Sequence, residues 1–274
     1  LGGNLILSGK SDINPAVFIG FLGVLYSIIS PIRDMMKCTF GIRKAMASVV
    51  RLNKILAIND EIINEKKDSI SESKEIPIIA IKDLSFKYDN ESVLENISLQ
   101  INKGQKVAIL GATGSGKSTL LSLLIRLYDD YEGTIQIGGK DIRSYSYNTI
   151  RNYITYVPQN PLLLNDSIKN NITLCNDKFS EEDIIRAAKQ AEIHDFITLL
   201  PDDYNTIIGD RGCNLSGGQQ QGISLTRAFI KDSPILLIDE GTAALDPELE
   251  SNVMSNIINN MNDKTMIIVS HKIS

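Results

Sequence analysis

A glycine-rich segment in the first half of the chain has the residue types that bind phosphate. It reads Gly111-Ala112-Thr113-Gly114-Ser115-Gly116-Lys117-Ser118, followed by Thr119, and fits G-x-x-x-x-G-K-[ST]. Glycines let backbone N–H groups converge on a phosphate, and a following helix adds its dipole. Lys117 can reach the β- and γ-phosphates, and the Ser118 hydroxyl can bind Mg²⁺. The alternative is a turn with a chance Lys-Ser pair, but a strand predicted before the segment and a helix predicted after it favour a phosphate loop.

Two adjacent acids, Asp239 and Glu240, follow the apolar run over 235–238. Ligands bind at the carboxyl ends of strands in open α/β sheets, so both acids are placed where a ligand would lie. Asp239 is expected to hold Mg²⁺ through water, and Glu240 is expected to accept a proton from the attacking water or to orient it. Taken alone, such a run is more often a strand that leaves the core. Beside a phosphate loop it predicts a catalytic pair.

A third segment lies between these two and reads Leu215-Ser216-Gly217-Gly218-Gln219. Alone it could be a Ser-Gly turn before the helix predicted over 223–230. The three segments in this order resemble the nucleotide-binding domains of ABC transporters. Residues 112–119 resemble the Walker A motif of that family, 215–219 its signature motif, and 235–240 its Walker B motif.

The resemblance implies roles for residues that would otherwise attract no attention. It implies ATP and Mg²⁺ as ligands, with Tyr88 stacked on adenine and Gln159 touching Mg²⁺. Asp246 matches the family's D-loop, and His271 matches a histidine that contacts the γ-phosphate. The alternatives are a core Tyr, a loop Gln, a helix-capping Asp and a surface His. Order and spacing along the chain favour the family roles.

Residues 206–212 resemble a segment specific to ABC exporters, T-E-V-G-E-R-G, which meets the membrane domain. Ile207 stands where that pattern has Glu, so one polar side chain of the pattern is missing. Gln220 and Gly222 stand where the family usually has Arg, and Gly241 where it has Pro or Ala. Gly222 lies early in a predicted helix, where glycine costs up to about 1 kcal/mol relative to alanine.

Residues 13–32 contain no charged side chain. A stretch of about 20 such residues can cross the hydrocarbon core of a bilayer as a helix. The alternative is a buried helix of a soluble protein. Basic residues follow the stretch, which places that end in the cytoplasm by the positive-inside rule. Apolar residues then recur three or four apart as far as Leu56, so the helix is expected to continue beyond the membrane.

The remaining sequence predicts a mixed α/β domain. Strands are predicted over 78–81, 84–88, 97–101, 106–110, 133–137, 154–157, 235–238 and 266–269, and helices over 117–127 and 181–191. We expect a RecA-like P-loop core with an antiparallel β subdomain and a helical subdomain, preceded by a transmembrane helix. The expected parts are the end of a membrane domain over 1–58, a linker over 59–76, and a nucleotide-binding domain over 77–274 that lacks its C-terminal end. The chain is expected to be a fragment of a longer protein.

The family resemblance implies an exporter ATPase in the cell membrane, with its nucleotide-binding domain in the cytoplasm. The expected partners are a second such domain in a homodimer, the protein's own membrane domain, and membrane lipid. The formal net charge of -5 gives no electrostatic case for nucleic acid. Three scattered cysteines predict neither a disulfide framework nor a zinc site. The alternatives are a soluble ABC ATPase of DNA repair or translation, and a regulatory half of a heterodimeric transporter.

Overall fold

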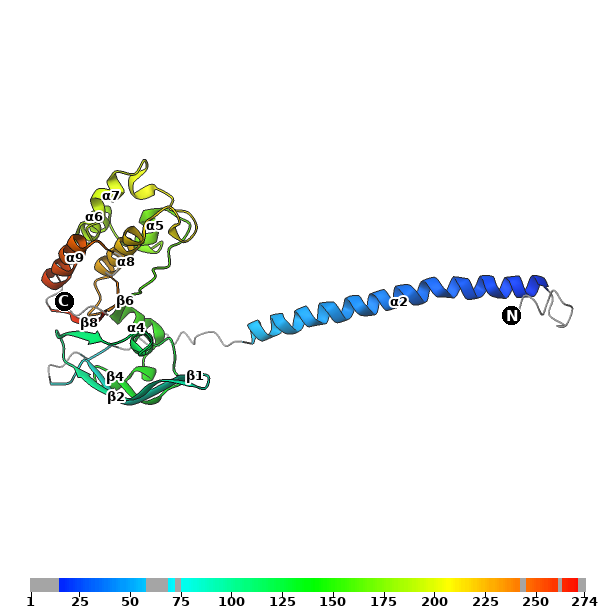
Figure 1. The fold of residues 1–274 in the computed structure, drawn as a ribbon, viewed down its shortest axis with the longest axis horizontal. Coiled ribbons are helices and arrows are strands. Elements are labelled where there is room, and N and C mark those ends of the chain that lie inside the picture. Colours follow the sequence, from blue (N-terminus) through cyan, green and yellow to red (C-terminus); the bar gives the residue numbers. More distant parts are fainter. Residues whose placement is uncertain (1–14, 58–68, 72–74, 242–244, 261–262, 271–274) are drawn as a thin grey trace. The chain divides into compact units, whose positions relative to one another are not determined.

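The computed structural model describes residues 15–57, 69–71, 75–241, 245–260 and 263–270. The chain divides into two units, Leu1–Ile62 and Ile63–Ser274 (Figure 1). The predicted linker over 59–76 falls largely outside the described residues, so the predicted domain bounds stay predictions.

The described part of the first unit is one long helix, α2 (Pro15–Leu56), of 42 residues. It continues through Pro31 without interruption (Figure 1). At 1.5 Å per residue it is about 63 Å long, roughly twice the thickness of a bilayer's hydrocarbon core. It is long and apolar enough to cross a membrane, and none of its most apolar window is buried. The predicted continuation beyond the apolar stretch is therefore confirmed as a single helix.

The second unit contains an antiparallel sheet with the strand order β2-β1-β4-β5. The strands are β1 (Ile79–Tyr88), β2 (Glu91–Ile101), β4 (Glu132–Ile137) and β5 (Lys140–Asp141). The sequence predicted two strands over 78–88, which was wrong, because β1 is one strand with an irregular register between Ile81 and Leu84. Asp83 takes a φ of 51° at this irregularity. A bulge there interrupts the apolar alternation and makes one strand look like two.

The same unit contains a parallel sheet with the order β3-β8-β7-β6. Its strands are β3 (Lys106–Leu110), β8 (Thr265–Ser270), β7 (Ile235–Asp239) and β6 (Ile154–Val157). Leu110 pairs with Ser270, and Asp239 pairs with Val269, so β3, β8 and β7 end together. The segments that follow β3, β6 and β7 consequently leave the sheet from one edge.

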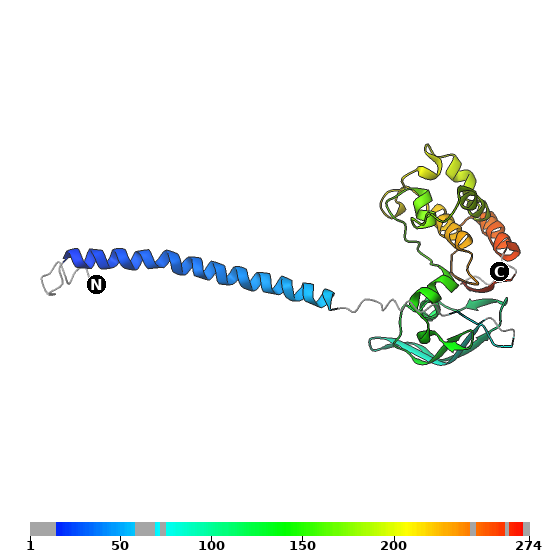
Figure 2. The same ribbon diagram turned by 180° about the vertical axis from the view of Figure 1, so that it is seen from behind.

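Helices cover both faces of the parallel sheet. The α-helices are α3 (Lys117–Leu124), α4 (Tyr147–Tyr153), α5 (Ile168–Thr173), α6 (Glu181–Gln190), α7 (His194–Thr198), α8 (Gly217–Lys231) and α9 (Pro247–Asn260). Short 3₁₀ turns are η1 (Ile142–Ser144), η2 (Asp203–Asn205) and η3 (Asp210–Gly212). Figure 1 shows α5–α9 grouped on one side of this unit and β1, β2 and β4 on the other, and Figure 2 shows the same grouping from behind.

Alternate residues of β7 belong to two hydrophobic clusters. Ile235 and Leu237 pack with the leucines of α3 and with β1 and β4, so α3 lies between the two sheets. Leu236 and Ile238 pack with α6, α8 and α9 on the opposite face. Because both faces are covered, β7 is an unbroken apolar run, as expected for a parallel strand. The predicted α/β architecture is confirmed.

Helix α8 begins earlier than the sequence suggested. Ser216 is its N-cap, and a capping box joins Ser216 to Gln219. Gly222 lies one turn later, and a Cβ added there would lie 2.6 Å from Ile193 Cδ1 and 3.2 Å from Ile193 Cβ. Glycine at 222 therefore lets the α6–α7 connection pack directly against α8, which offsets the loss of helix propensity.

Replacing Gly222 tests this packing. Alanine improves helix propensity by up to about 1 kcal/mol, but forcing a methyl group into a filled space costs about 1–3 kcal/mol. We expect Gly222→Ala to lower the free energy of unfolding by about 1 kcal/mol. Ile193→Val removes the Cδ1 atom that the new methyl group meets first, so adding it to Gly222→Ala should restore much of that loss. Denaturant unfolding of both single variants and the double variant gives the coupling. A clear stabilisation by Gly222→Ala alone would contradict the packing.

Candidate nucleotide-binding site

The loop between β3 and α3 is built to present backbone N–H groups. Gly114 and Gly116 have φ values of 81° and 84°, and Ser115 N donates to Ala112 O at 3.2 Å. Residues with a side chain rarely adopt such φ values, which accounts for glycine at both positions. Gly116 is the N-cap of α3 and supplies no side-chain cap, so the first N–H groups of the helix face the loop. Such a helix start attracts anions.

Gly116 is also required by its surroundings. A Cβ at this position would lie 2.9 Å from Val93 O and 2.7 Å from Leu94 Cδ2. Strand β2 of the antiparallel sheet therefore packs directly against the phosphate loop. Val93 also lines the cavity beside the loop. Sequence reasoning missed Val93, because nothing in a partly buried strand residue indicates contact with a loop more than twenty positions later.

The side chain of Lys117 is folded over the loop and is 8% exposed. Its Nζ donates to Gly111 O at 2.8 Å and to Ala112 O at 2.7 Å. Ser118 is exposed beside it. Both residues line a cavity of about 290 Å³ with Thr113, Gly114, Gly116, Thr119, Gln159 and Glu240. The structure thus brings most of the predicted loop residues together with Gln159, predicted to touch Mg²⁺, and Glu240, predicted to act on the attacking water.

Glu240 and Gln159 form the opposite wall of this cavity. Gln159 Nε2 donates to Glu240 Oε2 at 2.8 Å. Glu240 follows β7 and takes a φ of 49°, an uncommon conformation for a residue with a side chain. Such left-handed residues concentrate at functional sites, where the surroundings hold them. Here the backbone N–H of Glu240 donates to Val269 O at 3.1 Å. A carboxylate in this place can accept a proton from a water beside the phosphates.

Asp239 is 2% exposed, and its two oxygens differ. Oδ2 accepts a hydrogen bond of 3.1 Å from the Tyr156 hydroxyl, whereas Oδ1 is buried with no partner among the described residues. Burial, followed by the charge of Asp239, raises the pKa of Tyr156, so the phenol stays protonated and donates. An orphaned carboxylate oxygen fits a hard cation such as Mg²⁺, which is usually bound by one or two carboxylates and phosphate oxygens. The described residues contain no cluster of three acids, histidines or cysteines that would hold a metal by themselves.

Tyr88 lies in an aromatic cluster at the end of β1. Its ring centroid is 4.9 Å from that of Phe86 and 5.5 Å from that of Tyr128. The Tyr88 hydroxyl is 3.4 Å from Thr119 Oγ1, which connects the cluster to α3. A hydrogen bond with Tyr88 raises the pKa of Tyr128. With 40% of its surface exposed, Tyr88 can offer a face to a base beside the phosphate loop.

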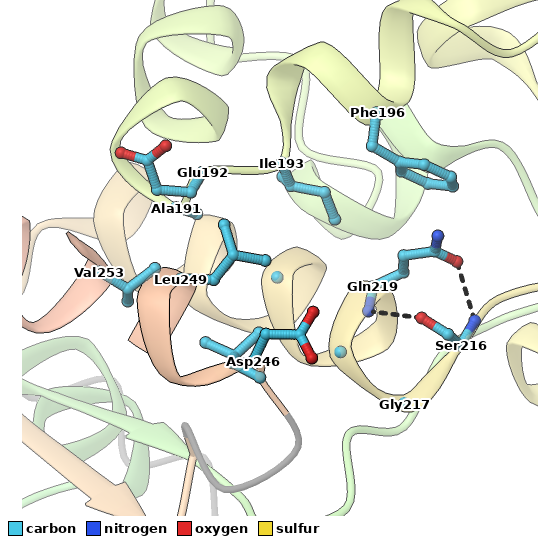
Figure 3. Close-up of a pocket in the computed structure, with 13 residues that line it drawn as sticks. Ala191, Glu192, Ile193, Phe196, Ser216, Gly217, Gln219, Asp246, Leu249 and Val253 are labelled. Atoms are coloured by element: carbon cyan, nitrogen blue, oxygen red, sulfur yellow. Dashed lines mark hydrogen bonds between the residues drawn. The ribbon is translucent and has the colours of Figure 1, made fainter. Parts of the chain in front are cut away.

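The predicted signature residues lie in a second pocket, of about 480 Å³, shown in Figure 3. Ser216 N donates to Gln219 Oε1 at 2.8 Å, and Gln219 N donates to Ser216 Oγ at 3.3 Å. The Asp246 carboxylate points toward the start of α8 in Figure 3. Apart from Glu192, the rest of the wall is apolar and includes Ile193, Phe196, Leu245, Leu249 and Val253. Among the described residues, none lines both this pocket and the phosphate-loop cavity, so the two pockets are separate.

Other predicted positions lie outside these pockets. His271 lies outside the described residues. Ile207 is 65% exposed and forms a β-bridge with Ser167, so an apolar side chain faces solvent where the exporter pattern has Glu. Gln220 Nε2 donates to Gly212 O at 3.1 Å and to Leu215 O at 3.3 Å, which ties the segment before the signature to α8. Gln221 Nε2 donates to Pro158 O at 3.3 Å, a contact that no local pattern indicated.

A strand, a phosphate loop and a helix on a parallel sheet, facing an Asp-Glu pair, define a P-loop nucleotide-binding domain. A family model described as ABC transporter matches residues 94–243, more than half of the chain. The chain therefore belongs to the ABC transporter family, and this unit is its nucleotide-binding domain.

Relatives with known names support the exporter class. The chain is 38% identical over its whole length to a protein of Desulfotalea psychrophila named ATP-dependent lipid A-core flippase, of which it covers 47%. It is 34% identical over 99% of its length to a multidrug export ATP-binding/permease protein, YgaD, of Bacillus subtilis, of which it also covers 47%. The structure of a bacterial Atm1-family ABC exporter with ATP bound matches with a TM-score of 0.76 and 34% identity, over 84% of this chain and 40% of that one. The chain thus spans about half the length of the curated relatives it matches.

Two glycines with similar backbones offer a matched test of the phosphate loop. Gly104 has a φ of 79°, and within the described structure its added Cβ would meet nothing within 4 Å. Gly116 has a φ of 84° and contacts β2. We expect Gly104→Ala to lower stability by about 1 kcal/mol through its backbone alone and to keep nucleotide affinity.

Gly116→Ala should also displace the loop and weaken ATP binding more than about 100-fold, because hydrogen bonds to charged groups contribute about 1.5–3 kcal/mol each. Titration with a fluorescent ATP analogue and thermal melting of both variants make the comparison. Equal ATP affinities in the two variants would contradict the steric role proposed for Gly116.

Proposed function

We propose that the full-length protein is an exporter of the cell membrane in which ATP hydrolysis by this domain drives export of a substrate. The apolar stretch of α2 would cross the membrane, and the nucleotide-binding unit would be cytoplasmic. Support comes from the basic residues of α2 that follow its apolar stretch, Arg33, Lys37, Arg43, Lys44, Arg51 and Lys54. An excess of basic residues beside a span marks its cytoplasmic side.

In this proposal, each predicted site residue has a defined role. The backbone of 111–119 and the Lys117 ammonium would hold the ATP phosphates, and Tyr88 would stack on the adenine. Ser118, Gln159 and Asp239 would hold Mg²⁺, which neutralises phosphate charge when it is bound. Glu240 would accept the proton of the attacking water. His271 would contact the γ-phosphate.

A dimer of two such domains is part of the proposal, and one observation carries it. In the described part of the chain, the phosphate-loop cavity and the signature pocket share no lining residue, although each holds only part of the predicted site. In a head-to-tail dimer each ATP would lie between the phosphate loop of one chain and Ser216–Gln219 of its partner, with Asp246 beside it. The start of α8 would then direct its positive end toward the γ-phosphate.

The two alternatives fit the molecule less well. A soluble ABC ATPase of DNA repair or translation would not need α2, whose apolar window is wholly unburied. A regulatory half of a heterodimer is disfavoured because Glu240 lines the phosphate-loop cavity and the signature motif caps α8 in full.

Substitution of Glu240 and Lys117 in the full-length protein tests catalysis. Glu240→Gln keeps the size and hydrogen bonding of the side chain but removes the basic oxygen. We expect Glu240→Gln to bind Mg-ATP normally, to hydrolyse it about 10²–10⁴-fold more slowly, and to accumulate a closed dimer with trapped nucleotide. Lys117→Ala removes a charged phosphate contact, so binding should fall about 10-fold or more together with turnover. ATP binding and single-turnover hydrolysis measure both. Near-normal turnover by Glu240→Gln would show that another residue acts as the base, and His271 is the first candidate.

Mixed dimers test whether Ser216 acts on the partner's nucleotide. Ser216→Arg should leave ATP binding to its own chain intact and block closure around the partner's nucleotide, whereas Ser216→Ala controls for loss of the helix cap, worth about 1 kcal/mol. Pairing a Lys117→Ala chain with a Ser216→Arg chain should leave one intact site. Placing both substitutions on one chain beside an unaltered partner should damage both sites. Hydrolysis by the first dimer and none by the second would support a site shared between the phosphate loop of one chain and Ser216 of its partner. Hydrolysis by the second dimer and none by the first would contradict it.

A further inference from the structure

Tyr156 contacts the proposed metal-binding carboxylate from a neighbouring strand. Tyr156 lies in β6 and pairs with Leu237 of β7, two residues before Asp239. Its hydroxyl donates to Asp239 Oδ2 at 3.1 Å. Since side chains two apart on a strand share a face, Asp239 lies on the same face as Leu237. Leu237 belongs to the hydrophobic cluster that contains the leucines of α3. Tyr156 therefore approaches Asp239 on the face where the phosphate loop enters α3.

The hydrogen bond from Tyr156 gives the two oxygens of the Asp239 carboxylate different roles. A buried carboxylate with neither oxygen paired would be free to rotate, and burying polar atoms without hydrogen bonds is costly. With Oδ2 held by Tyr156, only Oδ1 lacks a partner among the described residues. One oxygen is thus fixed to the protein scaffold, and the other is left for a ligand outside it.

We propose that Tyr156 is a positioning residue that holds Asp239 so that Oδ1 is directed at the metal of bound Mg-ATP. This proposal rests on the proposed function, in which Asp239 helps to hold Mg²⁺. Tyr156 does not touch the nucleotide or the reacting water. It acts by holding the Asp239 carboxylate in a single orientation before the ligand arrives, which lowers the reorganisation needed on binding.

The rival explanation is that the hydrogen bond only stabilises a buried carboxylate. In that case its loss would lower stability and every form of nucleotide binding together. If Tyr156 positions Asp239, its loss affects binding only when the metal is present. The informative quantity is therefore the metal-linked gain, the ratio of ATP dissociation constants measured without and with Mg²⁺.

The experiment uses the full-length protein carrying Glu240→Gln, so that ATP is bound but not consumed. ATP affinity is measured with excess Mg²⁺ and with EDTA, at a temperature below the melting transition of the least stable variant. Tyr156→Phe keeps the ring and removes only the donor. It should leave the affinity for metal-free ATP unchanged and reduce the metal-linked gain about tenfold, the low end of what a hydrogen bond to a charged group contributes.

Two further variants keep the outcomes distinct. Tyr147→Phe removes another phenol–carboxylate hydrogen bond, of 2.8 Å to Asp129, and should leave the metal-linked gain unchanged. Asp239→Asn should abolish most of the gain. If Asp239→Asn abolishes the gain and Tyr156→Phe does not alter it, the positioning role is overturned and the proposed function stands.

If neither variant alters the gain, Asp239 is not a metal ligand, and both proposals fail at that residue. A fall in metal-free affinity for Tyr156→Phe equal to the fall with Mg²⁺ would assign the hydrogen bond to stability alone.

Discussion

The register of the parallel sheet is the constraint on which the site depends. β3, β8 and β7 end level with one another, and β6 pairs beside β7, so the segments after β3, β6 and β7 start a few strand spacings apart. A slip of one residue in β7 would turn Asp239 to the opposite face, toward α8, and present Ile238 to α3. The apolar pattern does not prevent this slip, because residues on both faces of β7 are apolar.

Buried polar contacts at the other end of the strands supply the missing specificity. Thr155 Oγ1 donates to Ser233 Oγ at 2.8 Å, and Ser233 Oγ donates to Asn152 O at 3.0 Å, which joins β6 to the start of β7. Gly104 N donates to Thr265 Oγ1 at 3.0 Å, which joins β3 to β8. Breaking such a buried pair leaves unsatisfied groups that cost about 1–3 kcal/mol each, so a slipped register is strongly disfavoured. Polar residues far from the ligand therefore fix the position of those that would bind it.

Local patterns predicted much of this arrangement, and contacts between distant residues account for what they missed. The phosphate loop, the Asp-Glu pair and strands β6 and β7 follow from short segments, whose physics is contained within a few residues. The bulge at Asp83 escaped prediction because it breaks the alternation that marks a strand. The early start of α8 also escaped prediction. The Ser-Gly-Gly-Gln segment consists of residues common in turns, and its place at a helix start depends on the capping box. Tyr156 and Val93 could not be found, since each acts through a partner on another strand or loop.

Lys117 and Glu240, two charged groups of the site, differ in how their present partners would respond to bound ATP. Lys117 is held by the carbonyl oxygens of Gly111 and Ala112, which are neutral dipoles, so phosphate oxygens would replace them with full charges. Glu240 is held by Gln159, and a second anion near it is unfavourable. Under the proposed function, phosphate binding to Lys117 is then favourable from the start, whereas Glu240 becomes useful only when Gln159 releases it to a water. Gln159 lies next to Pro158, whose carbonyl accepts from Gln221 in α8, the helix that starts at Ser216. Movement of α8 on closure would therefore reach Glu240 through this contact, and nucleotide binding would precede activation of the base.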